Sequence, residues 1–198
     1  MKAVVFDLWD TLAAWPHEDM APLFQAVSLS PEEWVAADHR DLRWTGSFQS
    51  YLDSLAIDSE AAALAFEIRR EMTRRSLVPT EGAVEVLDEL RAAGLRLGLI
   101  SNCSSEVGDL WDDSPFAGRF DAVVLSADVG MKKPDPRIFR LTLDRLGVEP
   151  ADAIFVGDGE SGELPGAEAV GIRAIQLGDR DGWGGKRISE LRELLELV

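Results

Sequence analysis

Several residue types that define whole classes of protein are scarce in this chain of 198 residues. Cysteine occurs once, as Cys103, so no internal disulfide can form, and we expect a reducing compartment such as the cytoplasm. No apolar run approaches the length that crosses a bilayer, and the first residues lack the basic and then apolar pattern of a signal peptide. These features argue against a disulfide-stabilised secreted protein and against a membrane-spanning protein.

Basic residues are also few. The chain carries 20 Lys and Arg against 36 Asp and Glu, which gives a formal net charge of -16. Nucleic acids and anionic membranes are polyanions that an acidic surface repels, so we expect neither as a partner. An anionic small molecule would need a local positive centre, such as a lysine, an arginine or a metal ion.

The composition that remains is that of an ordinary globular protein, with 46% apolar and 28% charged residues. Short apolar runs predict buried strands, and the segments between them predict helices. The strands are expected at residues 3–6, 95–100, 122–125, 153–156 and 172–177, and the helices at 80–92, 106–112, 136–146, 164–170 and 188–197. Thr80 is expected to cap the first of these helices. Strands that alternate with helices indicate an α/β fold, a doubly wound Rossmann-like parallel sheet with helices on both faces.

Residues 15–78 interrupt this alternation with helical sequence. Helices are expected at 20–27, 34–44, 48–57 and 59–76, and Ser30-Pro31-Glu32-Glu33 has the spacing of a helix start. We therefore expect a core domain over residues 1–14 and 79–198 and a small helical-bundle cap domain over residues 15–78. Since this insert follows the first strand, it should cover the carboxyl edge of the sheet.

Polar side chains follow three of the predicted strands. Asp7 ends the first strand, Ser101-Asn102 the second and Asp158 the fourth, and Lys132-Lys133 lies between them in the sequence. Strand ends of a doubly wound sheet converge on one edge, where ligands bind. Two carboxylates, a hydroxyl and an ammonium gathered there can bind Mg²⁺ and a phosphate. One carboxylate could attack phosphorus and form an aspartyl phosphate.

Four segments in order resemble the haloacid dehalogenase (HAD) superfamily of hydrolases, in the subgroup with a helical cap after the first strand. They are VVFDLWDTL, LISN, GMKKPDPRIF and FVGDGESGELPGA. The resemblance implies that Asp7 is the nucleophile, that Ser101 binds the transferring group, and that Lys133 neutralises the developing charge. It also implies a Mg²⁺ cofactor and a small phosphorylated substrate.

The same resemblance implies roles for four further residues. Asp158 is the metal-ligating acid, and Glu163 takes the second acidic position, as an outer acid or as a partner of Lys133. Asn102 lies beside the transferring group. Thr11 supports the turn after Asp7 and belongs to the substrate-binding set.

One position departs from the family's phosphatases, which carry Asp-x-Asp-x-Thr. Here Trp9 replaces the second Asp, which serves as general acid and base. Asp10 should not substitute, because consecutive residues at a strand end point to different sides. Trp9 keeps the backbone carbonyl that ligates the metal in this family, and its side chain is expected near the substrate. Losing the acid costs about 10²–10⁴ in rate, mostly for alkyl phosphates, whose leaving group needs a proton.

We expect a Mg²⁺-dependent phosphatase with an aspartyl-phosphate intermediate, and Trp9 leaves two alternatives open. Haloacid dehalogenases of the superfamily also lack the second Asp and need no metal, but the Asp158 and Glu163 motif has the phosphatase form. A weakly active binding or regulatory protein is the other alternative, against which the retained Asp7, Ser101 and Lys133 argue. Phosphonatases need a cap lysine, and residues 13–78 contain none. Phosphomutases need the missing Asp.

The remaining polar residues are expected to have structural roles. His17 and His39 could touch substrate from the insert, and Arg40 and Arg43 could bind a substrate carboxylate, but surface or packing positions are favoured. Further, Cys103 is expected to be a small packing residue, Lys132 a solvated neighbour of Lys133, and Gly182–Gly185 a turn rather than a phosphate loop.

Overall fold

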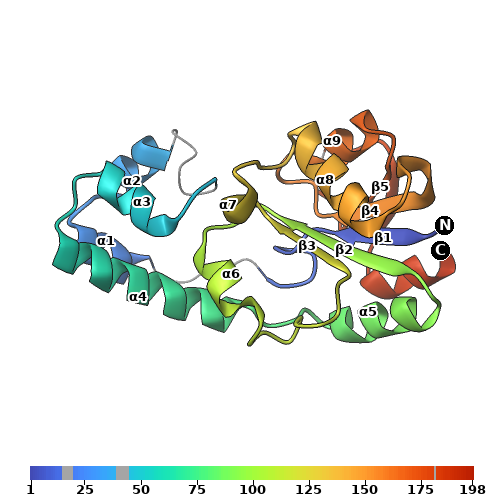
Figure 1. Ribbon diagram of the computed structural model, residues 1–198, viewed down its shortest axis with the longest axis horizontal. Coiled ribbons are helices and arrows are strands. Elements are labelled where there is room, and N and C mark those ends of the chain that lie inside the picture. The colour runs from blue at the N-terminus through green and yellow to red at the C-terminus, as the bar shows by residue number, and fades with distance from the viewer. Residues whose placement is uncertain (15–19, 39–44, 181) are drawn as a thin grey trace.

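The computed structural model describes residues 1–14, 20–38, 45–180 and 182–198, and in them it shows the predicted α/β fold (Figure 1). A parallel six-stranded sheet has the order β3-β2-β1-β4-β5-β6. The strands are β1 (Ala3–Phe6), β2 (Arg96–Ser101), β3 (Ala122–Leu125), β4 (Ala153–Gly157), β5 (Arg173–Leu177) and β6 (Lys186–Ile188). β1 is central because all four of its residues are apolar and buried, as a strand covered on both faces requires.

Helices cover both faces of the sheet (Figure 1). On one face, α5 (Ala83–Ala92) and the 3₁₀ helix η2 (Leu191–Glu196) pack on a core that includes Val4 and Phe6. On the other face, α8 (Pro136–Leu146) and α9 (Glu163–Ala169) pack on a core that includes Ala3 and Val5. The alternation of β1 side chains between two cores is the period of two of a strand.

In the described part of the chain between β1 and α5, four helices form a separate group beside the sheet (Figure 1). They are α1 (Ala21–Val27), α2 (Pro31–Asp38), α3 (Phe48–Ser54) and α4 (Ser59–Ser76). Their own apolar cluster includes Leu23, Trp34, Phe48 and Tyr51, so the aromatic residues here are packing residues. We call residues 21–76 the helical insert. Of the helix predicted at 34–44, residues 39–44 lie outside the described residues.

The helix start predicted at Ser30 is present as a capping box. The Glu33 backbone N–H donates to the Ser30 hydroxyl at 3.2 Å, and the Ser30 N–H donates to the Glu33 carboxylate at 2.7 Å. The two reciprocal bonds satisfy backbone donors that a helix start would otherwise leave unpaired.

The helical insert contacts the sheet domain through α6 (Glu106–Trp111). Arg69 of α4 and Glu106 form a buried ion pair, 2.7 Å from Nε to Oε1, and the Ser104 hydroxyl donates to the same oxygen at 2.7 Å. The Phe48 backbone N–H donates to the Ser105 hydroxyl at 2.9 Å. These polar contacts fix the start of α3 and the middle of α4 on the segment that directly follows Ser101.

Two expectations about secondary structure were wrong, and one short helix was not predicted. The helix predicted at 188–197 is replaced by the strand β6 and the short η2, because β5 offers a free edge to residues 186–188. Thr80 does not cap α5, which begins at Ala83; its hydroxyl donates instead to the Thr11 and Leu12 carbonyls and joins the returning chain to the segment after β1. The short helix α7 (Ser126–Val129) follows β3 without a recognised signal. None of the helices described is both long enough and apolar enough to cross a bilayer.

Candidate active site

Polar side chains gather where β1, β2 and β4 end, which are neighbours in the sheet. Asp7 directly follows β1, Ser101 is the last residue of β2, and Asp158 directly follows β4. The Asp7 backbone N–H donates to the Val156 carbonyl at 2.9 Å, so Asp7 continues the ladder between the two central strands. These three residues therefore lie at the same edge of the sheet, as their positions at the ends of parallel strands predict.

A buried lysine joins two carboxylates at the centre of this group. The Lys133 ammonium contacts Asp7 Oδ1 closely, and it lies 2.8 Å from Glu163 Oε2. The Lys133 side chain is 1% exposed and the Glu163 side chain 0% exposed. Three charged groups are thus held away from water, and each depends on the others because an isolated buried charge is costly.

Burial and neighbouring charge act in opposite directions on this trio. Burial raises the pKa of Asp7 to about 7, although the Lys133 charge acts to lower it. Burial acts to lower the pKa of Lys133, but the charges of Asp7 and Glu163 outweigh it and raise that pKa. Lys133 therefore stays cationic, while Asp7 is a carboxylate that holds a proton more tightly than an exposed one.

Glu163 links Lys133 to the loop after β4. Its Oε1 accepts a hydrogen bond from the Gly159 backbone N–H at 3.1 Å, while its Oε2 faces Lys133. A Cβ on Gly157 would overlap the Glu163 carboxylate, so this carboxylate can cross the end of β4 only because residue 157 is glycine. Of the two positions considered for Glu163, the structure shows the contact with Lys133.

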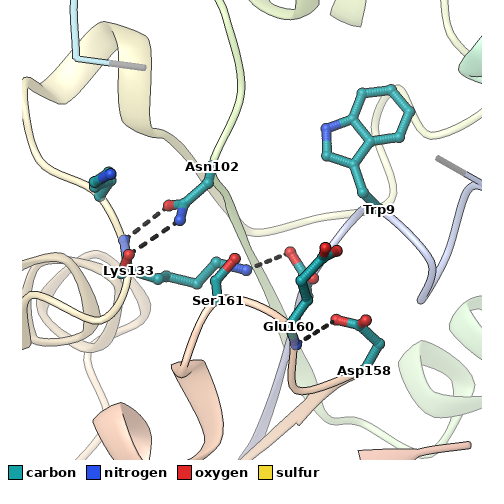
Figure 2. Close-up of a pocket in the computed structure, with 8 residues that line it drawn as sticks. Trp9, Asn102, Lys133, Asp158, Glu160 and Ser161 are labelled. Carbon is teal, nitrogen blue, oxygen red and sulfur yellow. Dashed lines mark hydrogen bonds and ion pairs between the residues drawn. The ribbon is translucent and has the colours of Figure 1, made fainter. Parts of the chain in front are cut away.

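Asn102 is bonded to the backbone of Lys133. Its Oδ1 accepts from the Lys133 N–H at 2.7 Å, and its Nδ2 donates to the Lys133 carbonyl at 3.0 Å, as Figure 2 shows. These two bonds hold the loop before α8 against the end of β2. They place the lysine side chain opposite Asp7.

Asp158 is paired with an arginine that the sequence argument did not single out. Asp158 Oδ1 accepts from the Glu160 N–H at 3.1 Å, and Asp158 Oδ2 accepts from Arg180 at 2.8 Å. Arg180 follows β5, so the only available signal was its position beyond a strand end. Sequence patterns do not give the pairing of a loop arginine with a particular acid.

A cavity of about 340 Å³ opens over this group and is lined by Asp7, Trp9, Asn102, Lys132, Lys133, Asp158, Glu160 and Ser161 (Figure 2). Trp9 is 8% exposed, belongs to the apolar core that includes Val4 and Phe6, and also lines the cavity. In Figure 2 its indole points away from the Asp158 carboxylate. Lys132 is partly exposed and lines the cavity as well. Glu160 and Ser161 were not anticipated, although they lie in the predicted acidic motif.

Three predicted site residues do not line this cavity: Glu163, which contacts Lys133 instead, Ser101 and Thr11. The Ser101 side chain is fully buried, and no hydrogen-bond partner for its hydroxyl is present among the described residues. Thr11 lines a different cavity, of about 490 Å³, which it shares with Thr80.

Cys103 is buried as expected of a packing residue, and burial raises the pKa of its thiol to about 12. His17, His39, Arg40 and Arg43 lie outside the described residues.

The carboxylates at the cavity suit a hard divalent cation. Oxygen atoms of Asp7, Asp158 and Glu163 lie within 4.8 Å of one another. Asp7 and Asp158 both reach the cavity, and the Trp9 backbone lies on the same turn. One or two carboxylates, with waters and a substrate oxygen, are the ligand set that Mg²⁺ takes in proteins. The donor chemistry therefore fits Mg²⁺.

Comparisons with known proteins all give relatives of one hydrolase family, which includes phosphatases and dehalogenases. The family model described as haloacid dehalogenase-like hydrolase matches residues 1–171. The phosphoserine phosphatase of Thermus thermophilus is 33% identical over 194 residues, which cover 90% of this chain and 74% of that protein. The crystal structure of a HAD phosphatase from Thermococcus onnurineus is similar with a TM-score of 0.71 at 26% identity, over 100% of this chain and 97% of that one. A 2-haloacid dehalogenase from Pseudomonas syringae is similar with a TM-score of 0.73 at 25% identity and the same coverage.

Proposed function

This chain belongs to the haloacid dehalogenase-like hydrolases, and we propose that it is a Mg²⁺-dependent phosphatase of a small phosphorylated metabolite. The observation that carries the proposal is the Asp7 carboxylate, fixed by the buried Lys133 at the wall of a cavity that also holds Asp158. A buried lysine beside a nucleophilic carboxylate stabilises the charge that gathers on a transferring phosphoryl group. The single cysteine and acidic surface fit a cytoplasmic enzyme.

In the proposed reaction a free oxygen of Asp7 attacks phosphorus. The new bond joins that oxygen to phosphorus, the bond to the leaving oxygen breaks, and its electron pair stays with the leaving group. Lys133 holds the other Asp7 oxygen and orients the attack. Water then attacks the aspartyl phosphate, releases inorganic phosphate and restores Asp7. Ser101 ends β2 and Asn102 follows it. We retain Ser101, whose buried hydroxyl has no hydrogen-bond partner among the described residues, as a phosphoryl contact, and we assign Asn102 to positioning Lys133.

Asp7, Asp158 and the Trp9 carbonyl would hold Mg²⁺, whose positive charge would bind and polarise the phosphoryl oxygens. The net charge of the site supports the need for a divalent cation. The charged side chains at the cavity and those bound to them comprise four carboxylates and three cations: Asp7, Asp158, Glu160 and Glu163 against Lys132, Lys133 and Arg180. The site is thus negative by one charge and would repel a phosphate dianion. A divalent cation reverses that sign.

Because Trp9 has no acidic proton to donate, the leaving group of the substrate decides how well it reacts. An alkyl leaving group departs as a strongly basic alkoxide unless an acid protonates it, whereas an aryl or acyl leaving group departs as a weak base. We therefore propose aryl or acyl phosphates as the better substrates. The helical insert lies beside the sheet and contacts the segment after Ser101, and we propose that it acts as the cap that selects the organic part of the substrate.

Dehalogenation is a second candidate, which two observations favour. Trp9 stands where the acid of phosphatases is found, and Arg180 already neutralises Asp158 without a metal. In that reaction Asp7 would displace halide from carbon, and water would hydrolyse the resulting ester.

One parallel assay separates the candidates. Phosphate release from p-nitrophenyl phosphate and acetyl phosphate, with Mg²⁺ and with EDTA, is measured beside chloride release from 2-chloropropionate. We expect Mg²⁺-dependent phosphate release that Asp7→Asn abolishes. Asp113→Asn, the same substitution at an exposed position, should retain full activity. Chloride release insensitive to EDTA would favour the dehalogenase, and no turnover in either assay would refute both.

A further inference from the structure

Arg180 lies in the loop after β5, and its guanidinium contacts the carboxylates of Asp158 and Glu160 at the cavity. Its guanidinium lies 2.8 Å from Asp158 Oδ2 and 3.8 Å from Glu160 Oε2. The carboxylates of Asp10, Asp158 and Glu160 have oxygens within 4.8 Å of one another. Three carboxylates at such spacing repel one another, so a cation between them stabilises the loop. Arg180 supplies that cation from within the chain.

The position of Arg180 is built into the fold through Gln176. The Gln176 side chain is buried, and its Nε2 donates both to the Asp158 carbonyl at 3.0 Å and to the Arg180 carbonyl at 2.9 Å. One amide therefore joins the loop after β4 to the loop after β5. The Arg180 backbone is held at a fixed place beside Asp158, while its side chain is 48% exposed and free at its outer side to move into solvent.

We propose that Arg180 competes with the divalent cation for Asp158 and so sets the cation affinity of the site. This inference rests on the proposed Mg²⁺ site. Arg180 occupies the Oδ2 oxygen of Asp158, and the backbone N–H of Glu160 occupies Oδ1. A cation that binds between Asp7 and Asp158 must use the lone pairs of Asp158 that remain or displace the guanidinium, and in either case the two positive charges repel each other across a few ångströms. Arg180 therefore stabilises the metal-free protein and lowers the affinity of the site for the cation.

The test measures Mg²⁺ binding rather than turnover. Isothermal titration calorimetry is run with MgCl₂ on the metal-free wild type and on Arg180→Gln, which keeps hydrogen-bonding groups but removes the charge. We expect Arg180→Gln to bind Mg²⁺ about tenfold more tightly, a modest value because the half-exposed guanidinium is screened by solvent. Arg180→Lys keeps the charge and should stay within about threefold of the wild type.

A matched control separates this local effect from the change in net charge. Arg173→Gln also removes one arginine, but at the start of β5, at the end of the strand away from Arg180, where the Arg173 guanidinium donates to the Leu197 carbonyl. Its Mg²⁺ affinity should equal that of the wild type. Thermal unfolding gives a second readout: in EDTA the Arg180→Gln variant should melt below the wild type, and added Mg²⁺ should raise its melting temperature by more.

The outcomes distinguish this inference from the proposed function. Equal or weaker Mg²⁺ binding by Arg180→Gln, while the wild type binds, would overturn the competition and leave the phosphatase proposal intact. Binding by Arg180→Gln alone would support the competition and count against Mg²⁺ as the wild-type cofactor. Absence of binding by all variants would overturn both. Tighter binding by Arg180→Gln without any phosphatase turnover would support the inference and refute the function.

Discussion

Replacing Lys133 with Met should destabilise the protein strongly and in a pH-dependent way. Methionine keeps the length and apolar stem of lysine but removes the charge that faces Asp7 and Glu163. Both carboxylates would remain buried, with oxygens within 4.8 Å of each other. Breaking a buried ion pair by removing one partner costs about 3–5 kcal/mol. At an effective dielectric of 20, repulsion between two carboxylates at this spacing is about 3 kcal/mol, so we expect a loss of that order at pH 8.

The direction of the pH effect follows from the carboxylates. Burial already holds the pKa of Asp7 above its ordinary value, and the Lys133 charge acts to lower it, so removing Lys133 raises the folded-state pKa of Asp7 further. A group whose folded pKa is raised in this way takes up a proton on folding, so the variant is relatively more stable at low pH and loses stability as pH rises. The deficit in the free energy of unfolding relative to the wild type should therefore be larger at pH 8 than at pH 5.

Urea unfolding monitored by circular dichroism at both pH values measures this deficit. Adding Glu163→Gln to Lys133→Met removes one of the two stranded charges and should recover a substantial part of the loss. Lys132→Met is the matched control, since Lys132 is partly exposed, and should change stability by less than about 1 kcal/mol. Equal unfolding midpoints for Lys133→Met and the wild type at both pH values would refute the view of Lys133 as the counterion of a buried carboxylate pair.

Three further predictions test other parts of the site. Trp9→Asp should raise turnover of an alkyl phosphate at least about tenfold and that of an aryl phosphate much less, because a general acid matters most for a poor leaving group; equal effects on both, measured by phosphate release, would contradict the argument. Mg²⁺ affinity should rise with pH up to about 7 and then level off, because burial raises the pKa of Asp7 to about 7 and its proton competes with the cation; calorimetry that finds equal affinities at pH 6 and pH 8 would count against it. Glu106→Leu should lower the free energy of unfolding by about 3–5 kcal/mol, because it strands the buried Arg69 guanidinium; a loss in urea unfolding below 1 kcal/mol would show that Arg69 finds another partner.

The fold was accessible from sequence because its strands are short, apolar and covered on both faces. Ala3–Phe6 and Ala153–Gly157 have no competing helical pattern, and the segments between strands predict helices. The α/β fold and the family are therefore confirmed. The error at residues 188–197 has a local cause: Lys186–Ile188 is only a three-residue strand, and it forms because it pairs with β5, a contact far from its own sequence neighbours.

The placement of the candidate site was accessible for a different reason. Parallel strands carry their carboxyl ends to one edge, so Asp7, Ser101 and Asp158 were expected together before any contact was known. Which of these residues form hydrogen bonds or ion pairs with one another depends on loop conformation, and loops have no periodic sequence pattern that would predict it. The two hydrogen bonds between Asn102 and the Lys133 backbone and the pairing of Arg180 with Asp158 belong to this class. The catalytic roles assigned to these residues stay predictions.

The turn after Asp7 explains why a neighbouring acid does not replace the missing one. Asp10 has a φ of 54°, a left-handed conformation that turns its side chain away from the course of β1. Its carboxylate joins Asp158 and Glu160, and it lines the neighbouring pockets rather than the cavity beside Lys133. Trp9 is buried in the apolar core on this side of the sheet, and its burial holds the turn that carries Asp10 in place. In the turn after Asp7, neither Trp9 nor Asp10 therefore offers an acid at the position that the proposed leaving group would need, which is the physical basis for expecting substrates whose leaving groups need no proton.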